Sequence, residues 1–177
     1  MFIELGHCPF IYWFTGYLDH AQKDSACSVI VGGTCDDSKG YFVDPTIIET
    51  TDPNTKSIRE EIFGPVLTVM VYDDDKFSEI LEVCDQGSDY ALTGSIFAQD
   101  RKALALADEK LRNSAGNFYI NDKSTGSVVA QQPFGGARAS GTNDKAGFMS
   151  IYNRFCSIRS IKENMLPQRT WRYPSMD

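Results

Sequence analysis

The chain has 177 residues, 42% of them hydrophobic, which suits one globular domain with a core of its own. Seventeen Lys and Arg residues against 24 Asp and Glu residues give a net charge of −7, and the sequence contains no basic run. Nucleic acid and anionic membrane surfaces are therefore excluded as expected partners, and no apolar run reaches the length of a membrane span.

The cysteines argue against a metal site and against a disulfide framework. There are five of them, scattered and without a C-x-x-C pair, and only His7 and His20 are available as further ligands. A reducing compartment suits this pattern better than an oxidising one.

Residues 1–16 open with an aromatic and apolar stretch, MFIELGHCPFIYWFT, that has neither helical nor strand periodicity. We expect this segment to be frayed or only partly packed. Further on, Ser28–Val31 predicts a strand that ends in a turn at Gly32–Gly33. The stretch Tyr41–Ile48 predicts an extended piece that Pro45 restricts to the edge of a sheet.

A regular alternation of strands and helices begins at Val66–Tyr72, a nearly continuous apolar run typical of a strand buried on both faces. Phe77–Cys84 then repeats apolar residues at helical spacing, after acidic residues suited to a helix start. Two further strands, Gly94–Ala98 and Asn117–Ile120, flank a helix that Asp100 is suited to cap. The pattern predicts an α/β fold with a parallel β-α-β-α-β core, in which ligands bind beyond the carboxyl ends of the strands.

A long loop rich in Gly, Ser and Thr follows the third of these strands and ends at Pro133–Gly136. Such a loop in a compact domain is more often functional than idle, because its backbone polar groups need partners. Its Gly126–Ser127 step can offer N–H donors and a hydroxyl to a small anionic group. Taken alone, the step is better explained as a plain turn. Lys123 adds a positive charge, although a solvated lysine explains it at least as well.

A second motif, EIFGP at residues 61–65, can present two groups to one ligand. Residues two apart in an extended segment point the same way, so Glu61 and Phe63 would offer a carboxylate and an aromatic ring on one side. A carboxylate accepts both hydroxyl hydrogens of a ribose, and a ring packs on a flat heterocycle. The alternative is a helix that ends at Gly64–Pro65 and buries Phe63 in the core. We expect the preceding Glu60 to be solvated.

Together these strings resemble the aldehyde dehydrogenase superfamily. NDKSTGS at residues 121–127 and QPFGG at residues 132–136, combined with EIFGP at residues 61–65, are similar in particular to the L-glutamate γ-semialdehyde (Δ1-pyrroline-5-carboxylate) dehydrogenases. Either motif alone is weak evidence, whereas their co-occurrence is specific. The resemblance covers the chain from about residue 17 to residue 162.

The resemblance implies a partial catalytic domain over residues 17–150, followed by a terminal oligomerisation strand and tail over residues 151–177. Within the tail, Phe155–Ile161 alternates imperfectly, like an edge strand with one wet face. Subunit pairing, as a homo-oligomer or with full-length subunits, follows from the resemblance alone. So does the mitochondrial matrix, because the sequence shows no targeting peptide.

The resemblance also implies the ligands and the residues that contact them. The cofactor would be NAD, contacted by Glu61 and Phe63. The substrate would be an amino-acid aldehyde, its carboxylate held by Gly126 and Ser127 and its methylene chain packed on Phe134. We therefore expect Glu61, Phe63 and Phe134 to flank one shared hollow.

No residue of the chain is assigned as catalytic. Oxidation of an aldehyde needs a thiolate that forms a thiohemiacetal, with donors for the oxyanion and a base. Cys84 lies on the apolar stripe of a helix and is expected in the core. Cys27, Cys35 and Cys156 lack a neighbouring His or Gly-rich loop that would lower the pKa of a thiol, and Cys8 lies in the unmatched segment.

Two classes of function remain open on the sequence. The first is an NAD-dependent oxidation of L-glutamate γ-semialdehyde to L-glutamate in proline breakdown, of which this chain carries cofactor and substrate contacts and is inactive alone. The second is a non-catalytic product that pairs with full-length subunits. Another aldehyde dehydrogenase remains a variant of the first.

Overall fold

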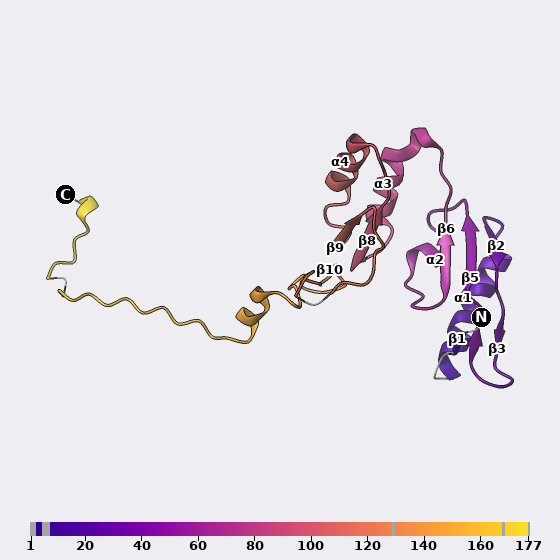
Figure 1. The fold of residues 1–177 in the computed structure, drawn as a ribbon, viewed down its shortest axis with the longest axis horizontal. Coiled ribbons are helices and arrows are strands. Elements are labelled where there is room, and N and C mark those ends of the chain that lie inside the picture. The colour runs from indigo at the N-terminus through magenta and orange to yellow at the C-terminus, as the bar shows by residue number, and fades with distance from the viewer. Residues whose placement is uncertain (1–2, 5–7, 129, 168, 177) are drawn as a thin grey trace.

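The computed structural model describes residues 3–4, 8–128, 130–167 and 169–176, and it shows two small lobes followed by an extended tail (Figure 1). The N-terminal lobe contains α1 (Cys8–Lys23), α2 (Lys56–Arg59), β1 (Ile3–Glu4), β2 (Cys27–Val31), β3 (Cys35–Asp36), β4 (Phe42–Val43), β5 (Thr46–Thr50) and β6 (Val66–Val69). The second lobe contains η1 (Asp74–Lys76), α3 (Phe77–Gln86), β7 (Tyr90–Ala91), β8 (Thr93–Ile96), α4 (Arg101–Lys110), β9 (Asn117–Ile120) and β10 (Ala137–Arg138). Two further short helices, η2 (Met149–Arg154) and η3 (Pro174–Met176), lie at the start and the end of the tail.

Helix α1 corrects the expectation of a frayed start. It runs without a break across residue 16 and supplies most of the core of the N-terminal lobe. The buried members of that core are Ile11, Phe14, Tyr17, Val43 and Ile62. The sequence concealed the helix because aromatic residues also occupy its exposed side, at Phe10, Tyr12 and Trp13, and so obscure the helical period.

The three-stranded sheet of the N-terminal lobe has the order β2-β5-β6, with β5 antiparallel to β2 and parallel to β6. The expectation of an edge strand near Pro45 was wrong, because β5 is central. Pro45 precedes the first residue of β5, so its missing N–H lies outside the ladder. The expected turn after β2 is present, with Gly32 and Gly33 at φ of 74° and 91°.

The second lobe contains the predicted parallel β-α-β unit, but the third strand does not join it. Strands β8 and β9 pair in parallel and are connected through α4, whereas β6 pairs with β5 in the other sheet. The prediction of one parallel sheet with three strands was therefore wrong. Strand β6 is also not buried on both faces, since Leu67 is 58% exposed and Val71, just beyond it, is 75% exposed. The described chain therefore leaves part of the apolar surface of β6 exposed to solvent.

The two longer helices of the second lobe agree with the sequence pattern. Helix α3 buries Leu81 and α4 buries Leu104 and Ala107. The carboxylate of Asp100 caps α4 by accepting a hydrogen bond of 2.8 Å from the backbone N–H of Lys102. Asp73 makes no such side-chain cap, and its backbone carbonyl instead accepts from Lys76 to form the single turn η1.

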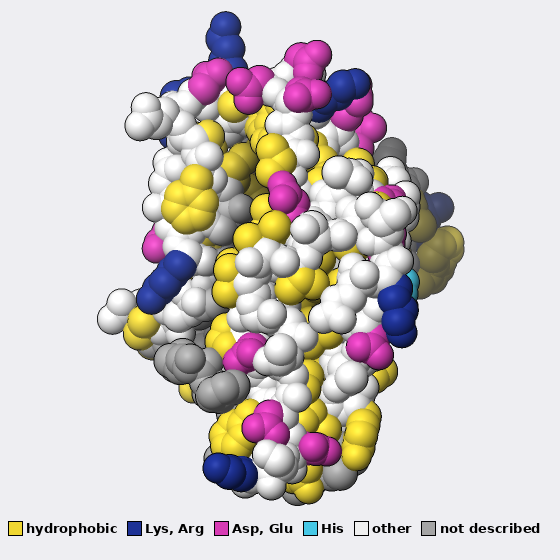
Figure 2. Space-filling model, turned by 90° about the vertical axis from the view of Figure 1, so that its right-hand side faces the viewer, with side chains coloured by type: hydrophobic (Ala, Val, Ile, Leu, Met, Phe, Trp, Pro, Cys, Tyr) yellow, Lys and Arg dark blue, Asp and Glu magenta, His cyan; other side chains and the backbone are white. Residues whose placement is uncertain are grey.

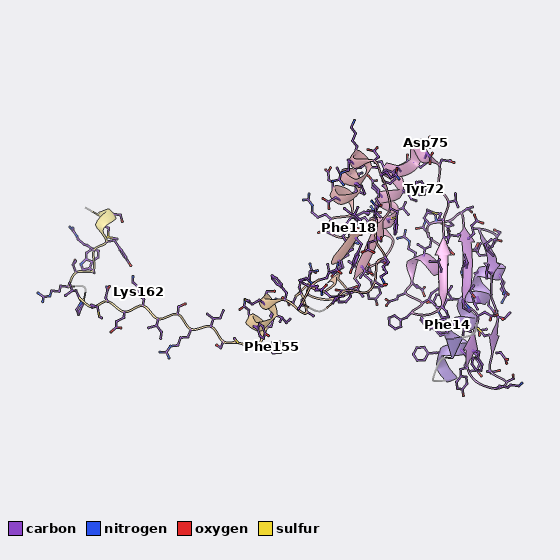
Figure 3. The ribbon with its side chains drawn as sticks, viewed as in Figure 1. Phe14, Tyr72, Asp75, Phe118, Phe155 and Lys162 are labelled. Atoms are coloured by element: carbon purple, nitrogen blue, oxygen red, sulfur yellow. The ribbon has the colours of Figure 1, made fainter. Side chains whose placement is uncertain are left out.

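The tail does not form the expected terminal strand. Residues 155–161 have no β pairing, and Phe155, Ile158 and Ile161 are 83%, 76% and 76% exposed. Figure 3 shows Phe155 at the base of the tail and Lys162 farther along it, with side chains projecting from a lone segment. A strand needs a backbone partner, and no other described segment lies beside this one.

Substitution of Gly64 by alanine is expected to destabilise the chain. A Cβ at this position would lie 2.0 Å from Cε1 of Phe14, the fully buried ring of α1. Moving that ring should cost about 1–3 kcal/mol of unfolding free energy, as overpacking of a core does. Urea denaturation followed by circular dichroism measures the loss.

Gly16→Ala is the matched control, because a Cβ at Gly16 in α1 meets nothing within 4 Å. Alanine there should be neutral or stabilise the helix by up to about 1 kcal/mol. Equal unfolding free energies for Gly64→Ala and Gly16→Ala would show that the contact with Phe14 does not restrict residue 64 to glycine.

Candidate functional site

The loop of residues 60–65 between α2 and β6 presents Glu61 and Phe63 on its outer side. Ile62 is 8% exposed and belongs to the core, whereas Phe63, the next residue, is 84% exposed. Glu61 is exposed as well, so the alternation expected from an extended segment is present. The alternative with Phe63 in the core is wrong, because Ile62 takes that place. Phe63 has a φ of 56°, in the left-handed region.

Helix α1 supports this loop through two contacts. The indole N–H of Trp13 donates to the carbonyl of Ile62 at 3.3 Å, and Gly64 lies directly against the ring of Phe14. Both contacts come from the part of the chain in which the sequence analysis found no structure. The aromatic cluster at residues 12–14 was the available signal, although it lies 49 residues from the carbonyl that it bonds.

Glu60 is exposed, as expected, and its carboxylate is also bonded within the chain. The hydroxyl of Tyr17 donates to Oε2 of Glu60 at 2.5 Å, and Nζ of Lys56 lies 3.9 Å from the same oxygen. The ammonium of Lys56 also lies 4.6 Å from the centre of the Tyr17 ring. Burial, followed by the hydrogen bond and negative charge of Glu60, raises the pKa of Tyr17 to about 12.

A hollow between the two lobes includes Glu61. It has a volume of about 390 Å³ and is lined by Trp13, Tyr17, Arg59, Glu60, Glu61, Ser88, Asp89 and Tyr90. The guanidinium of Arg59 donates to the carbonyl of Gln86 and so connects α2 to the end of α3. Glu61 is thus accessible from a cavity whose walls carry both charge signs and aromatic rings.

A second cavity, of about 410 Å³, brings together the three residues predicted to bind substrate. Gly126, Ser127 and Phe134 line it with Leu92, Thr93, Ser124, Thr125, Gln132, Ala146 and Gly147. Gly126 has a φ of 84°, which favours glycine, and the hydroxyl of Ser127 donates to the carbonyl of Gln132 at 2.8 Å. Gly126 and Ser127 thereby face the same space as Phe134, which lies seven residues beyond Ser127 in the loop.

Asn117, which the sequence analysis did not single out, fixes the loop that carries Phe134. Its side chain is buried, donating to the carbonyl of Pro133 at 2.9 Å and accepting from the N–H of Gly135 at 3.0 Å. An asparagine that opens an apolar strand was the available signal, because a buried amide needs hydrogen-bond partners. The contact is close: a Cβ on Gly116 would lie 1.9 Å from the carbonyl oxygen of Gly135.

The two cavities are separate, which corrects the expectation of one shared hollow. Glu61 lines the cavity between the lobes, and Phe134 lines the cavity of the second lobe. Phe63 lines neither of them. The structure brings Gly126, Ser127 and Phe134 around one cavity, whereas Glu61 and Phe63 share no cavity with each other or with Phe134.

None of the described cysteines lines the cavity of Gly126, Ser127 and Phe134. Burial raises the pKa of the Cys35 and Cys84 thiols, the opposite of what an attacking thiolate requires. Cys84 is exposed rather than in the core, and it lines an apolar hollow of about 330 Å³ between α3, α4 and β8. Among the described residues, no group of three or more His, Cys, Asp or Glu side chains could hold a metal ion.

The described surface and helices add two observations. None of the described helices combines the length and the apolar character needed to cross a membrane. On the face of the molecule seen in Figure 2, Lys and Arg side chains lie among acidic and apolar ones rather than in one basic cluster.

Comparison with known proteins decides the family. A model of the aldehyde dehydrogenase family matches residues 12–161. This chain belongs to the aldehyde dehydrogenase family. The resemblance read from the two motifs is confirmed, and the match begins within α1, ahead of residue 17.

The most informative relatives are Δ1-pyrroline-5-carboxylate dehydrogenases. The chain is 56% identical to the mitochondrial enzyme of Danio rerio over 161 residues, which are 91% of this chain and 29% of the relative. It is 58% identical to the mitochondrial enzyme of Dictyostelium discoideum over 160 residues, 90% of this chain and 29% of the relative. The chain therefore spans less than a third of these relatives.

A solved structure supports the fold. The Δ-pyrroline-5-carboxylate dehydrogenase of Mycobacterium tuberculosis superimposes with a TM-score of 0.80 at 46% identity, over 98% of this chain and 32% of that protein. The same enzyme bound with NAD gives the same TM-score. Its mixed α/β content agrees with the fold class expected here.

Tyr17 gives a prediction about pH. Because the pKa of Tyr17 is about 12 when folded and about 10 when unfolded, the unfolded chain loses this proton first as the pH rises. The stability contributed by Tyr17 is therefore complete below pH 10 and is lost between pH 10 and about 12. Tyr17→Phe should make the fall in unfolding free energy over this interval shallower.

The measurement is chemical denaturation at a series of pH values for both chains. Tyr152→Phe serves as the control, because Tyr152 is exposed and should leave the slope unchanged. If unfolding free energy falls equally with pH in wild type and in Tyr17→Phe, then folding does not raise the pKa of Tyr17.

Proposed function

We propose that this chain is the cofactor- and substrate-contacting part of an NAD-dependent enzyme that oxidises L-glutamate γ-semialdehyde, formed from Δ1-pyrroline-5-carboxylate, to L-glutamate in proline breakdown. The observation that carries the proposal is the cavity in which Gly126, Ser127 and Phe134 meet. The names of the relatives support the same substrate class. On this proposal residues 17–150 are part of a catalytic domain and residues 151–177 form an oligomerisation segment and tail.

The cavity suits an aldehyde that carries a charged end and a short apolar chain. The hydroxyl of Ser127 is already committed to Gln132, so recognition of a carboxylate falls to the N–H groups of Gly126 and Ser127. No hydrogen bond to another described residue occupies these two N–H groups. Phe134 supplies an apolar wall for the methylene chain.

The loop of residues 60–65 suits a nicotinamide cofactor. Glu61 and Phe63 are both exposed, and the ring of Phe63, 84% exposed, lies outside the hydrophobic core of the described residues. Glu61 would accept the ribose hydroxyls, and Phe63 would pack on the flat ring. NAD, when bound, accepts the hydride that the aldehyde carbon loses. Glu61 and Phe63 would only hold and orient it.

The thiolate that this oxidation needs has no counterpart among the described cysteines. The pKa of Cys35 and of Cys84 is raised rather than lowered, and neither residue lines the cavity of Gly126. On the proposal, the nucleophile and the rest of the NAD site come from sequence that the relatives have and this chain does not span. The proposed location is the mitochondrial matrix; the names of the relatives support a mitochondrial location.

A second function is supported by the tail. Phe155, Ile158 and Ile161 are 83%, 76% and 76% exposed, and residues 155–161 pair with no described strand. Such a segment could add to a sheet of another subunit, so the chain would pair with full-length subunits and alter their activity. This function does not require turnover by the chain itself.

Mixing experiments separate the two functions. The purified chain with NAD and glutamate semialdehyde should not reduce the cofactor, because no thiolate is available; the absorbance of NADH measures this. Added to the Danio rerio enzyme, the chain should lower its activity only if it pairs with subunits. Turnover by the chain alone would contradict the first proposal, and activity that stays constant at excess chain would contradict the second.

Substitution of Gly126 tests the carboxylate anchor. A chimera in which this chain replaces the matched part of the Danio rerio enzyme supplies the missing segments. In it, Gly126→Ala forces alanine to a φ of 84° and brings its Cβ within 3.3 Å of Cε of Lys123. We expect kcat/KM for glutamate semialdehyde to fall about tenfold or more, and kcat/KM for propanal to change little.

Gly16→Ala in the same chimera is the control for the added methyl group. An equal loss on both aldehydes would contradict a carboxylate-binding role, because a general distortion does not distinguish a charged substrate from an uncharged one.

A further inference from the structure

The ammonium of Lys145 has only neutral partners in the described structure. It donates to the carbonyls of Gly116 and Gly135, the second at 2.9 Å, and its Nζ lies 3.5 Å from Oδ1 of Asn117. No described carboxylate lies within ion-pair distance of it. Partial burial lowers the pKa of Lys145, as expected for a charge withdrawn from water without a counter-ion.

These acceptors come from two separate segments that meet only at this point. Gly116 and Asn117 lie at the start of β9, whereas Gly135 lies at the end of the long loop that follows it. Lys145 itself belongs to a third segment, downstream of β10. A lysine ammonium has three N–H donors, which matches three acceptors arranged around it.

The segment that carries Lys145 is also a wall of the substrate cavity. Ala146, the next residue, exchanges two backbone hydrogen bonds with Phe134, of 3.0 and 2.8 Å. Ala146 and Gly147 line the cavity beside Phe134. Fixing Lys145 therefore fixes the strip of backbone to which Phe134 is paired.

Asn117 holds the same loop through hydrogen bonds of its own. Its amide bonds Pro133 and Gly135, the residues on either side of Phe134. Asn117 thus fixes the residues before and after Phe134. Lys145 fixes the segment that pairs with Phe134 through Ala146. Gly126 and Ser127, on the other wall, belong to a part of the loop that neither residue contacts.

We propose that Lys145 is a positioning residue whose ammonium sets the location of Phe134 relative to the Gly126–Ser127 step. The separation of these two walls determines which length of carboxylate-bearing aliphatic chain fits the cavity. This inference rests on the proposed function for its substrate class. The placement of Phe134 by Lys145 can be tested without it.

The test uses the full chain and nuclear magnetic resonance. In wild type, an ammonium held by three acceptors should give a proton signal for Lys145 that is protected from solvent exchange. In Lys145→Met, which keeps the length of the stem but removes the donors, the N–H of Gly135 should exchange about tenfold faster, the scale of one lost charge-assisted hydrogen bond. The Phe134 ring signals should shift as well.

A ligand readout connects this placement to binding. L-glutamate is the probe, and its titration should shift the Gly126 and Phe134 signals of wild type and bind Lys145→Met about tenfold more weakly. Lys102→Met is the matched control, because it removes an exposed lysine of α4 and should alter neither readout.

Each outcome decides one of the two proposals. Unchanged Gly135 exchange and Phe134 signals in Lys145→Met would overturn the positioning role. The absence of a protected ammonium signal in wild type would overturn it too, even if the variant fails to fold. A third outcome separates the proposals. If wild type shows no signal shift with L-glutamate while the Gly135 N–H still exchanges faster in Lys145→Met, the proposed substrate class is contradicted and the positioning role is supported.

Discussion

The buried amide of Asn117 is the interaction on which the second cavity depends. It connects the start of β9 to the far end of a long loop through two hydrogen bonds, to Pro133 and Gly135. Without these bonds the loop would leave its own polar groups and a buried amide unpaired, at a cost of about 1–3 kcal/mol for each group. The backbones meet so closely that Gly116 has no room for a side chain. The position of Phe134 follows from this contact.

The N-terminal lobe holds its motif by a comparable arrangement with different chemistry. There the support is aromatic: the ring of Phe14 lies under Gly64 and the indole of Trp13 bonds the carbonyl of Ile62. In both lobes a loop that carries one of the two motifs is held by a residue that is distant in sequence. Each motif is therefore short in the sequence, while the support that gives it a fixed geometry is not.

Sequence reasoning succeeded where the information is local. The apolar spacing of α3 and the Asp100 cap of α4 depend on neighbours within a few residues, and both were predicted. It failed for α1, where aromatic residues occupy both the buried and the exposed side. It also failed for β6, because the spacing of apolar residues along a strand does not specify which strand it pairs with. In the second cavity, the sequence singled out Gly126, Ser127 and Phe134, which line one space, because their types form a distinctive motif. Lys145 was missed because its partners are backbone carbonyls, which any sequence has.

The backbone at Phe63 has a consequence for how this chain can change. A non-glycine residue at a φ of 56° costs about 1–2 kcal/mol, and a ring that is 84% exposed returns little of it through burial. Selection for stability alone would favour glycine at this position, whereas the proposed packing of Phe63 on a flat ligand would favour phenylalanine. On that proposal, stability and ligand affinity compete at one residue, and variants selected for stability should be checked there first.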